Sequence, residues 1–232
     1  MKEKEDIQSI RDQHTNGLGV QYLLALKNKL ILDELREIQP KLKQDTPQHI
    51  IDLFHYISDT AKRDVILGLS KIYDRPSERN NKLRNINKFI CQLQRHKIEI
   101  FNTIDLIGDS WNNFLNKHSK IINKYPLLNT KKENFIDFIQ EIVTNLETKN
   151  HTIDRLRVWR DKYLAHNENY SDEVKLSIEE VETLFEITYL IIDFSNSFFN
   201  INTVLIEKPN IGFIKEVFMN YIDISSSQIN FA

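Results

Sequence analysis

The chain has 232 residues, with 31 Lys and Arg against 33 Asp and Glu, which gives a formal net charge of −2 at pH 7. A chain so close to neutrality offers no global attraction to nucleic acid or to an acidic membrane surface, so any site for a polyanion must be local. The single cysteine, Cys91, excludes an intramolecular disulfide and a cysteine-based zinc cluster, and it fits a reducing compartment.

The N-terminal residues from Met1 to Asp6 are charged, and no apolar run follows them. This start predicts that the chain has no signal peptide. No stretch of the sequence approaches the ~20 apolar residues that a membrane span requires. We therefore expect a cytoplasmic protein without membrane contact.

Apolar residues recur at spacings of three and four along the chain, which contains only 5 Gly and 5 Pro. This pattern predicts an all-α fold. Asn16 to Gly19 are expected to form a loop, and the first helix follows it and stops before Pro40. The buried stripe expected for this helix is Val20, Leu23, Leu24, Leu30, Ile31, Leu35 and Ile38.

The second helix is expected to start at Thr46-Pro47, because a proline is tolerated at the first helical position. Its predicted core stripe is Ile50, Phe54, Ile57, Ala61, Val65, Leu69 and Ile72. A polar loop from Tyr73 to Asn81 should follow, and then a helix from about Lys82 to Gln94. One long helix is predicted from about Lys97 to Asn123.

Two capping boxes predict further helix starts, at Thr130 to Glu133 and at Ser177 to Glu180. In this motif a hydroxyl accepts a backbone N–H bond while the glutamate three residues later reaches back. The helix after Ser177 is the most apolar, so we expect it to be central or shared with a partner subunit. A shorter helix is predicted from about Ile211 to Tyr221. The chain is expected to form one domain over residues 1–232, with residues 1–16 and 225–232 frayed.

The segment from Arg157 to Asn167 is the one place where the sequence suggests chemistry. Ile153, Leu156, Trp159 and Tyr163 share one helical face, and Arg155, Arg157, Arg160 and Lys162 should supply local positive potential. A histidine exchanges protons near neutral pH, and an arginine holds phosphate and stabilises charge that builds on it. Together they could cleave RNA without a metal, by attack of the substrate's 2′-hydroxyl on the adjacent phosphorus.

The spacing of Arg160 and His166 leaves two interpretations open. Six residues turn an ideal helix by about 600°, which places these side chains roughly 120° apart and about 9 Å apart along the axis. They would meet only if His166 lay beyond the helix end, or if a second copy of the helix supplied one of them. The structural alternative makes Arg157 and Asp161 an exposed ion pair and His166 a polar helix end.

The residues from Arg160 to His166, RDKYLAH, resemble the signature of the HEPN superfamily. In that signature an arginine is followed by four to six residues and then a histidine, with a polar residue directly after the arginine. Leu69 to Pro76, LSKIYDRP, resembles the end of the second helix in the abortive-infection, AbiU-like branch. The resemblance implies a HEPN-like helical bundle with additional helices. It also implies a homodimer whose two motifs line one cleft, acting in many members as a metal-independent RNase toxin or phage-defence effector.

By this resemblance Arg160 and His166 would be the catalytic pair, Asp161 the orienting polar residue, and Arg157 and Lys162 contacts to the RNA backbone. No metal or other cofactor is expected. The partners implied are RNA, a second copy of the chain and a neutralising antitoxin.

Some HEPN toxins carry a tyrosine two residues after the histidine, which a partner nucleotidyltransferase modifies. Glu168 stands there in this chain, which puts control by that route in doubt. Because superfamily membership does not establish activity, two alternatives remain. One is a non-catalytic HEPN-like module that binds a nucleotide, RNA or a protein, and the other is a helical scaffold without a nucleic-acid role.

Overall fold

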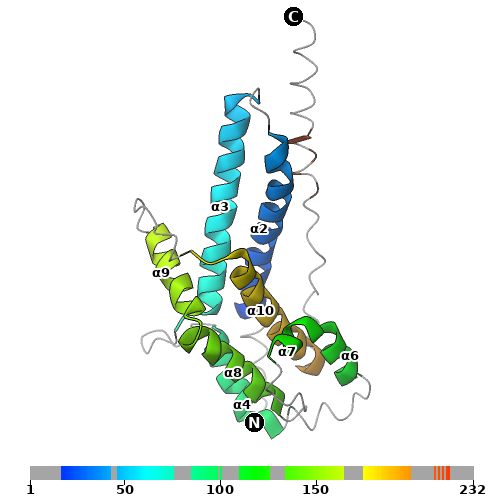
Figure 1. Ribbon diagram of the computed structural model, residues 1–232. Helices are drawn as coiled ribbons and strands as arrows, with labels where there is room; N and C mark the ends of the chain where they lie inside the picture. The colour runs from blue at the N-terminus through cyan, green and yellow to red at the C-terminus, as the bar shows by residue number, and fades with distance from the viewer. Residues whose placement is uncertain are drawn as a thin grey trace, which may run out of the picture. The chain divides into compact units, whose positions relative to one another are not determined.

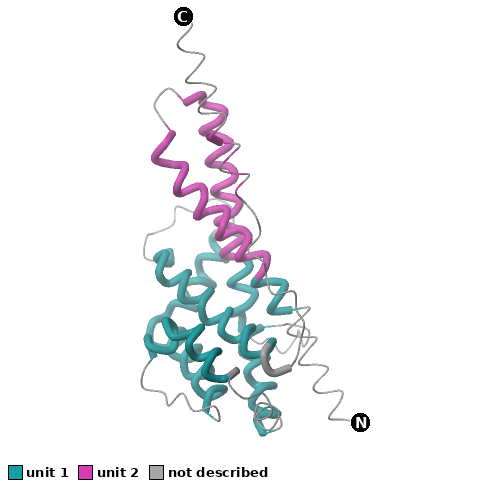
Figure 2. The backbone as a smooth tube through the Cα atoms, turned by 90° about the vertical axis from the view of Figure 1, so that its right-hand side faces the viewer, with its two compact units in different colours: residues 1–22, 68–205 teal, residues 23–67, 206–232 magenta. Residues whose placement is uncertain are grey.

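The computed structural model describes residues 17–42, 46–75, 85–98, 100, 110–125, 134–164 and 175–199, and single residues of a C-terminal helical segment between 212 and 219. Every regular element in these ranges is helical, which confirms the all-α prediction (Figure 1). No helix there is long and apolar enough to cross a membrane. Contacts divide the chain into two compact units, residues 1–22 with 68–205 and residues 23–67 with 206–232 (Figure 2). That the whole chain is one domain stays a prediction.

The smaller unit is built from most of two long helices, α2 (Gly19–Ile38) and α3 (Gln48–Ile72), with the short 3-10 turn η2 (Gln39–Lys41) after the first. Pro47 directly precedes α3, and its carbonyl accepts a hydrogen bond from the Ile50 N–H at 2.9 Å, as the start at Thr46-Pro47 predicted. The core of this unit comprises Leu35, Ile38, Ile50, Phe54, Ile214 and Phe218. The C-terminal helical segment therefore completes the core that α2 and α3 begin.

The predicted stripe of α2 is right only in its C-terminal half. Leu35 and Ile38 are buried, whereas Val20, Leu23 and Leu24 are 40%, 38% and 54% exposed. The buried residues near the start of the helix are Leu18, Tyr22 and Ala25. Apolar residues occupy more than one face of this helix, so their spacing alone did not identify the face that packs. Gly17 and Leu18, expected in a loop, form a π-helical turn that leads into α2.

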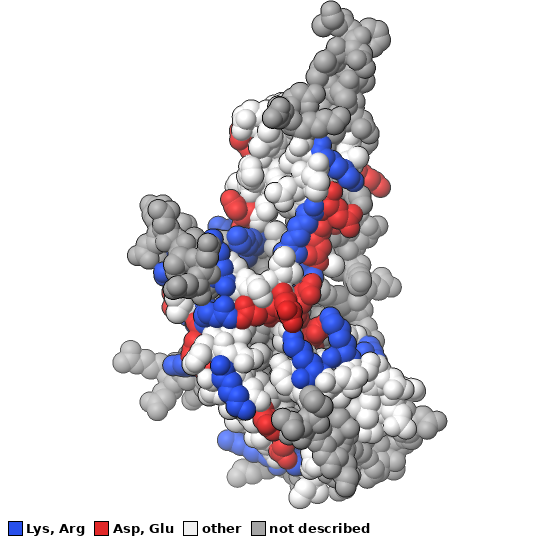
Figure 3. Space-filling view, viewed as in Figure 1, with Lys and Arg blue, Asp and Glu red and all other residues white. Residues whose placement is uncertain are grey.

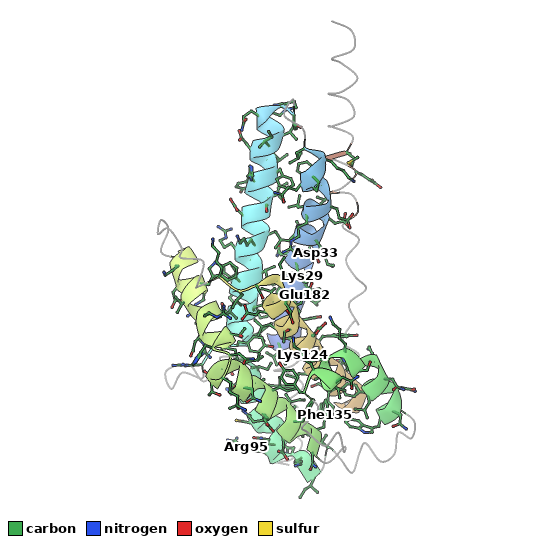
Figure 4. All side chains as sticks on the ribbon, viewed as in Figure 1. Lys29, Asp33, Arg95, Lys124, Phe135 and Glu182 are labelled. Atoms are coloured by element: carbon green, nitrogen blue, oxygen red, sulfur yellow. The ribbon has the colours of Figure 1, made fainter. Side chains whose placement is uncertain are left out.

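The described residues of the larger unit include the start of α2 and the last turn of α3. They also form the helices α4 (Ile86–Arg95), α6 (Ser110–Lys117), α7 (Ser119–Lys124), α8 (Phe135–Thr148), α9 (Thr152–Leu164) and α10 (Ile178–Phe199). The core of this unit contains a cluster of aromatic rings among aliphatic side chains. The ring of Phe135, labelled in Figure 4, lies 4.8 Å from the ring of Phe194 and 5.3 Å from that of Phe114. In α10, Leu184, Ile187, Leu190 and Ile191 are also buried, so this helix packs on several sides as predicted.

The start of α10 confirms the predicted capping box. The Glu180 N–H donates to the Ser177 hydroxyl at 3.2 Å, and the Ser177 N–H donates to the Glu180 carboxylate at 2.8 Å. The other predicted box, at Thr130 to Glu133, lies outside the described residues. The described helix in that region, α8, begins at Phe135.

Two other helix boundaries differ from the prediction. The helix placed at Lys82 begins instead at Ile86, because Asn85 is extended and its side chain caps the Lys88 N–H at 2.9 Å. The long helix predicted from Lys97 to Asn123 is interrupted at His118, whose backbone (φ −105°, ψ 16°) separates α6 from α7. The His118 side chain is buried and its Nε2 lies 2.7 Å from Asp193 of α10. This long-range contact accompanies the break, and residue spacing could not reveal it.

Candidate active site at the end of α9

One face of α9 holds the helix in the larger unit. Ile153, Leu156 and Trp159 are at most 5% exposed, as the predicted apolar face requires. The helix follows α8 through a tight corner at His151, whose φ of 52° lies in the left-handed region. With this face buried, the charged residues of α9 must lie on the remaining sides.

Arg160 lies between two carboxylates. Its Nε donates to Asp161 at 2.8 Å, and its Nη1 lies 3.3 Å from Asp74, in the segment that follows α3. The side chain is only 22% exposed. Burial opposes the charge of the guanidinium, but the hydrogen bonds and negative charges of Asp161 and Asp74 outweigh it and raise the pKa of Arg160. A fixed, fully charged guanidinium is well suited to bind a phosphate.

The other predicted site residues have surroundings that differ from those of Arg160. Asp161 contacts Arg160 directly, in keeping with an orienting role, and its side chain is 64% exposed. Lys162 is partly exposed and forms no ion pair with another described residue. His166 lies outside the described residues, so its approach to Arg160 stays a prediction.

Arg157 is not placed as an RNA contact would be. Its side chain is 10% exposed, and its Nη1 bonds to Glu147 at 2.7 Å and to Asp154 at 2.9 Å. Its Nη2 donates to the carbonyl of Tyr73 at 2.7 Å. The alternative that paired Arg157 with Asp161 on the surface is therefore wrong, because Asp161 pairs with Arg160. Arg157 joins α8, α9 and the segment after α3 and has little surface left to offer a phosphate.

The local positive potential expected around α9 is reduced by ion pairs in the described part of the chain. Arg155 pairs with Glu180, and the other arginines of α9 pair as described above. Lys117, the last residue of α6, pairs with Asp193 of α10, and Lys120 and Lys124 of α7 pair with Glu186 and Glu179 of α10. Figure 3 accordingly shows basic and acidic side chains interspersed on the viewed face, without a single basic patch. The arginines of α9 therefore pair with Asp154 and Asp161 of the same helix and with carboxylates from other segments.

The two segments that carried the family resemblance meet in space. Tyr73 contacts Arg157 through its carbonyl, Asp74 contacts Arg160, and Arg75 bonds to Asp154 at 3.0 Å. The Tyr73 hydroxyl is completely buried and lies 2.9 Å from the Leu184 carbonyl and 3.0 Å from the Thr188 hydroxyl. Burial raises the pKa of this phenol. Sequence reasoning missed Asp74 as a site residue, although the similarity of Leu69 to Pro76 to the family pointed to this segment.

The sequence analysis also missed a second polar cluster, around His118. His118 had no acidic companion along the chain, but its Nε2 lies 2.7 Å from Asp193, which also accepts from Lys117 at 2.9 Å. Burial raises the pKa of Asp193, but the hydrogen bonds from His118 and Lys117 lower it by more, so the net shift is downward. The His118 ring packs 4.7 Å from the Phe114 ring and 5.2 Å from that of Tyr189. Because His118 is enclosed in this way, we interpret its contact with Asp193 as a structural link between α6, α7 and α10 and not as part of a reacting site.

A pocket of about 200 Å³ opens elsewhere in the larger unit, between the end of α7 and the starts of α9 and α10. Its lining includes Lys124, Thr152 and Thr183. Lys124 donates to Thr183 at 3.0 Å, and Thr152 donates to Glu180 at 3.3 Å. None of the described site residues, Arg157, Arg160, Asp161 and Lys162, lines it, so the candidate site remains the end of α9.

The all-α fold is consistent with a HEPN-like helical bundle. The family model described as AbiU2 matches residues 8–203, and the chain therefore belongs to the HEPN AbiU2 family, which is of the abortive-infection type. The match confirms the resemblance seen in the RDKYLAH and LSKIYDRP segments. Comparisons with curated proteins and with solved structures gave no match.

Proposed function

We propose that this protein is a metal-independent endoribonuclease that acts as a toxin or phage-defence effector. Arg160 holds the scissile phosphate, and His166 transfers protons. Family membership supports an abortive-infection role. The observation that carries the proposal is the guanidinium of Arg160, fixed by Asp161 and Asp74 near the end of α9.

Arg160 has the donors for this task. A guanidinium carries five N–H groups, and the contacts to Asp161 and Asp74 use those on Nε and Nη1. Neither contact uses Nη2, which can meet a phosphate oxygen. A preorganised cation at this point stabilises the charge that builds on phosphorus in the transition state, without reorganisation during the reaction.

The reaction needs a base and an acid besides this cation. His166 accepts the proton of the 2′-hydroxyl, whose oxygen attacks the adjacent phosphorus while the bond from phosphorus to the 5′-oxygen breaks. The leaving oxygen takes a proton from an imidazolium, and the products are a 2′,3′-cyclic phosphate and a 5′-hydroxyl. A homodimer with both motifs in one cleft would supply one His166 as base and another as acid. A neutralising antitoxin would act by covering that cleft.

Purified protein and a labelled RNA test this proposal. Cleavage should persist in excess chelator, leave 2′,3′-cyclic phosphate ends and spare DNA of the same sequence, which lacks the internal nucleophile. His166→Ala and Arg160→Ala should each reduce the rate by at least about 100-fold. Arg95→Ala, which removes an exposed arginine from α4, is the matched control and should cleave like the parent. Unchanged cleavage by His166→Ala would refute the mechanism.

The balance of charge around α9 favours one alternative, a non-catalytic HEPN-like module. Five described cations, Arg75, Arg155, Arg157, Arg160 and Lys162, are balanced by five carboxylates, those of Asp74, Glu147, Asp154, Asp161 and Glu180. Such a surface attracts RNA weakly. A protein partner can pair with charges of both signs and suits it better. Absence of cleavage at every pH from 6 to 8, with a stable protein or nucleotide complex, would favour this module.

A further inference from the structure

We infer that Asp74 is a positioning residue of the same site, which sets the orientation of the Arg160 guanidinium toward the RNA phosphate. The inference rests on the proposed ribonuclease function. It assigns a role to a residue 86 positions before Arg160 in the chain, outside the arginine–histidine motif.

The two carboxylates hold Arg160 at two different nitrogens. Asp161 accepts from Nε at 2.8 Å, and Asp74 lies 3.3 Å from Nη1. A bond at Nε alone leaves the outer end of the guanidinium free to tilt about the side-chain torsions. A second contact at Nη1 restricts this tilt and fixes the direction in which Nη2 points. Asp161 is the next residue on the same helix, so Asp74 is the anchor that lies outside α9.

The carboxylate of Asp74 is itself oriented, because each of its oxygens has a separate partner. Oδ1 accepts the backbone N–H of Arg75 at 3.1 Å, and Oδ2 faces Arg160. An aspartate that bonds to the backbone of the following residue loses much of its rotational freedom. Asp74 is 32% exposed on its side chain, so the pair with Arg160 is less screened than an ion pair in open solvent.

The residues before and after Asp74, Tyr73 and Arg75, both contact other helices of the unit. Before it, the fully buried Tyr73 bonds to Leu184 through its hydroxyl and to Arg157 through its carbonyl. After it, Arg75 contacts Asp154 at 3.0 Å and Glu147 at 3.4 Å. Three consecutive residues thus connect the end of α3 to α8, α9 and α10. A carboxylate held on such a segment can impose a fixed position on Arg160, which a carboxylate on an untethered loop could not.

The test combines kinetics with a double-mutant cycle. Asp74→Ala should lower kcat by about 10- to 100-fold, because misplacing a catalytic group by about 1 Å costs on that order, with KM changed less than about twofold. In an Arg160→Ala background, the same substitution should change the remaining rate less than about twofold. Asp74→Asn, which keeps the shape and one acceptor oxygen, should lie between Ala and the parent and serves if Asp74→Ala does not fold. Asp137→Ala is the matched control, because it removes an exposed aspartate that pairs with Lys97 at 2.6 Å on another part of this unit.

A second measurement separates this inference from the proposed function. The Nη1–H resonance of Arg160, assigned by its loss in Arg160→Ala, should be protected from solvent exchange in the parent, and at least about tenfold less so in Asp74→Ala, because Asp74 contacts Nη1. Equal rate losses in the parent and Arg160→Ala backgrounds, or unchanged kcat, would overturn the positioning role. If the parent does not cleave RNA, the proposed function fails and the catalytic role of Asp74 fails with it. The resonance then shows whether Asp74 orients Arg160, and an unchanged exchange rate would refute that too.

Discussion

Arg157 allows a direct comparison of a buried and an exposed arginine that share the same carboxylates. Arg157 and Arg75 both pair with Glu147 and Asp154, but the Arg157 side chain is 10% exposed and that of Arg75 is 66% exposed. We predict that Arg157→Ala destabilises the larger unit by about 3 kcal/mol, at the lower end of the range for removing one partner from a buried ion pair. We predict that Arg75→Ala costs less than about 1 kcal/mol, as for a surface pair.

The expected magnitude for Arg157 follows from what the substitution leaves behind. The Tyr73 carbonyl loses its 2.7 Å bond from Nη2, and a buried acceptor without a partner costs about 1–3 kcal/mol. Glu147 and Asp154 lose a charged partner, but they are 27% and 41% exposed, so water offsets part of that loss. Arg157→Lys should cost about half as much as Arg157→Ala, because an ammonium keeps the charge but cannot reach three acceptors with one fixed fork.

Urea denaturation followed by circular dichroism measures these differences, with the free energy of unfolding extrapolated from transitions of equal slope. Equal losses for Arg157→Ala and Arg75→Ala would refute the reasoning. A loss below about 1 kcal/mol for Arg157→Ala, combined with weaker RNA binding, would restore Arg157 as a backbone contact.

Two further predictions concern pH and salt. The pKa of Asp193 is lowered in the folded protein, so its contribution to stability is present above its unfolded pKa of about 3.9 and is lost as the pH falls through the lower folded value. The free energy of unfolding should therefore fall less below about pH 4 in Asp193→Asn than in the parent, and an identical decline in both would contradict the shift. Because Arg157 is engaged within the fold, RNA binding should depend weakly on salt. Binding titrations should give a logarithmic slope of about −1.4 if Arg160 and Lys162 each neutralise one phosphate, and a slope steeper than about −3 would show that other cations take part.

Features that depend on neighbours in sequence could be predicted well. The Ser177 capping box, the start of α3 after Pro47 and the buried stripe from Ile50 to Ile72 all agree with the structure. Each depends on hydrogen bonds or side-chain spacing within a few turns of one helix, and such interactions are present in the local sequence. The motif from Arg160 to His166 likewise sufficed to indicate the family that the comparison then established.

Features that depend on distant partners could not be predicted. The break at His118 accompanies a contact with Asp193, and the pairing of Arg157 runs to Glu147, Asp154 and Tyr73. Helical spacing predicted an ion pair between Arg157 and Asp161, but carboxylates from other segments compete for the same arginines. Which carboxylate is closer depends on how the helices pack, and no pattern along one helix contains that information.

The sequence by itself determined that the chain is helical, where several helices start and which motif identifies the family, because these depend on short-range hydrogen bonding and side-chain period. Only the tertiary structure decided that the arginines of α9 are neutralised rather than gathered into a basic patch. It also decided that Arg160 is held from outside its own helix by Asp74, at 3.3 Å. Electrostatic interactions depend on distance in space, and Arg160 and Asp74 lie more than 80 residues apart in the chain and meet only after folding.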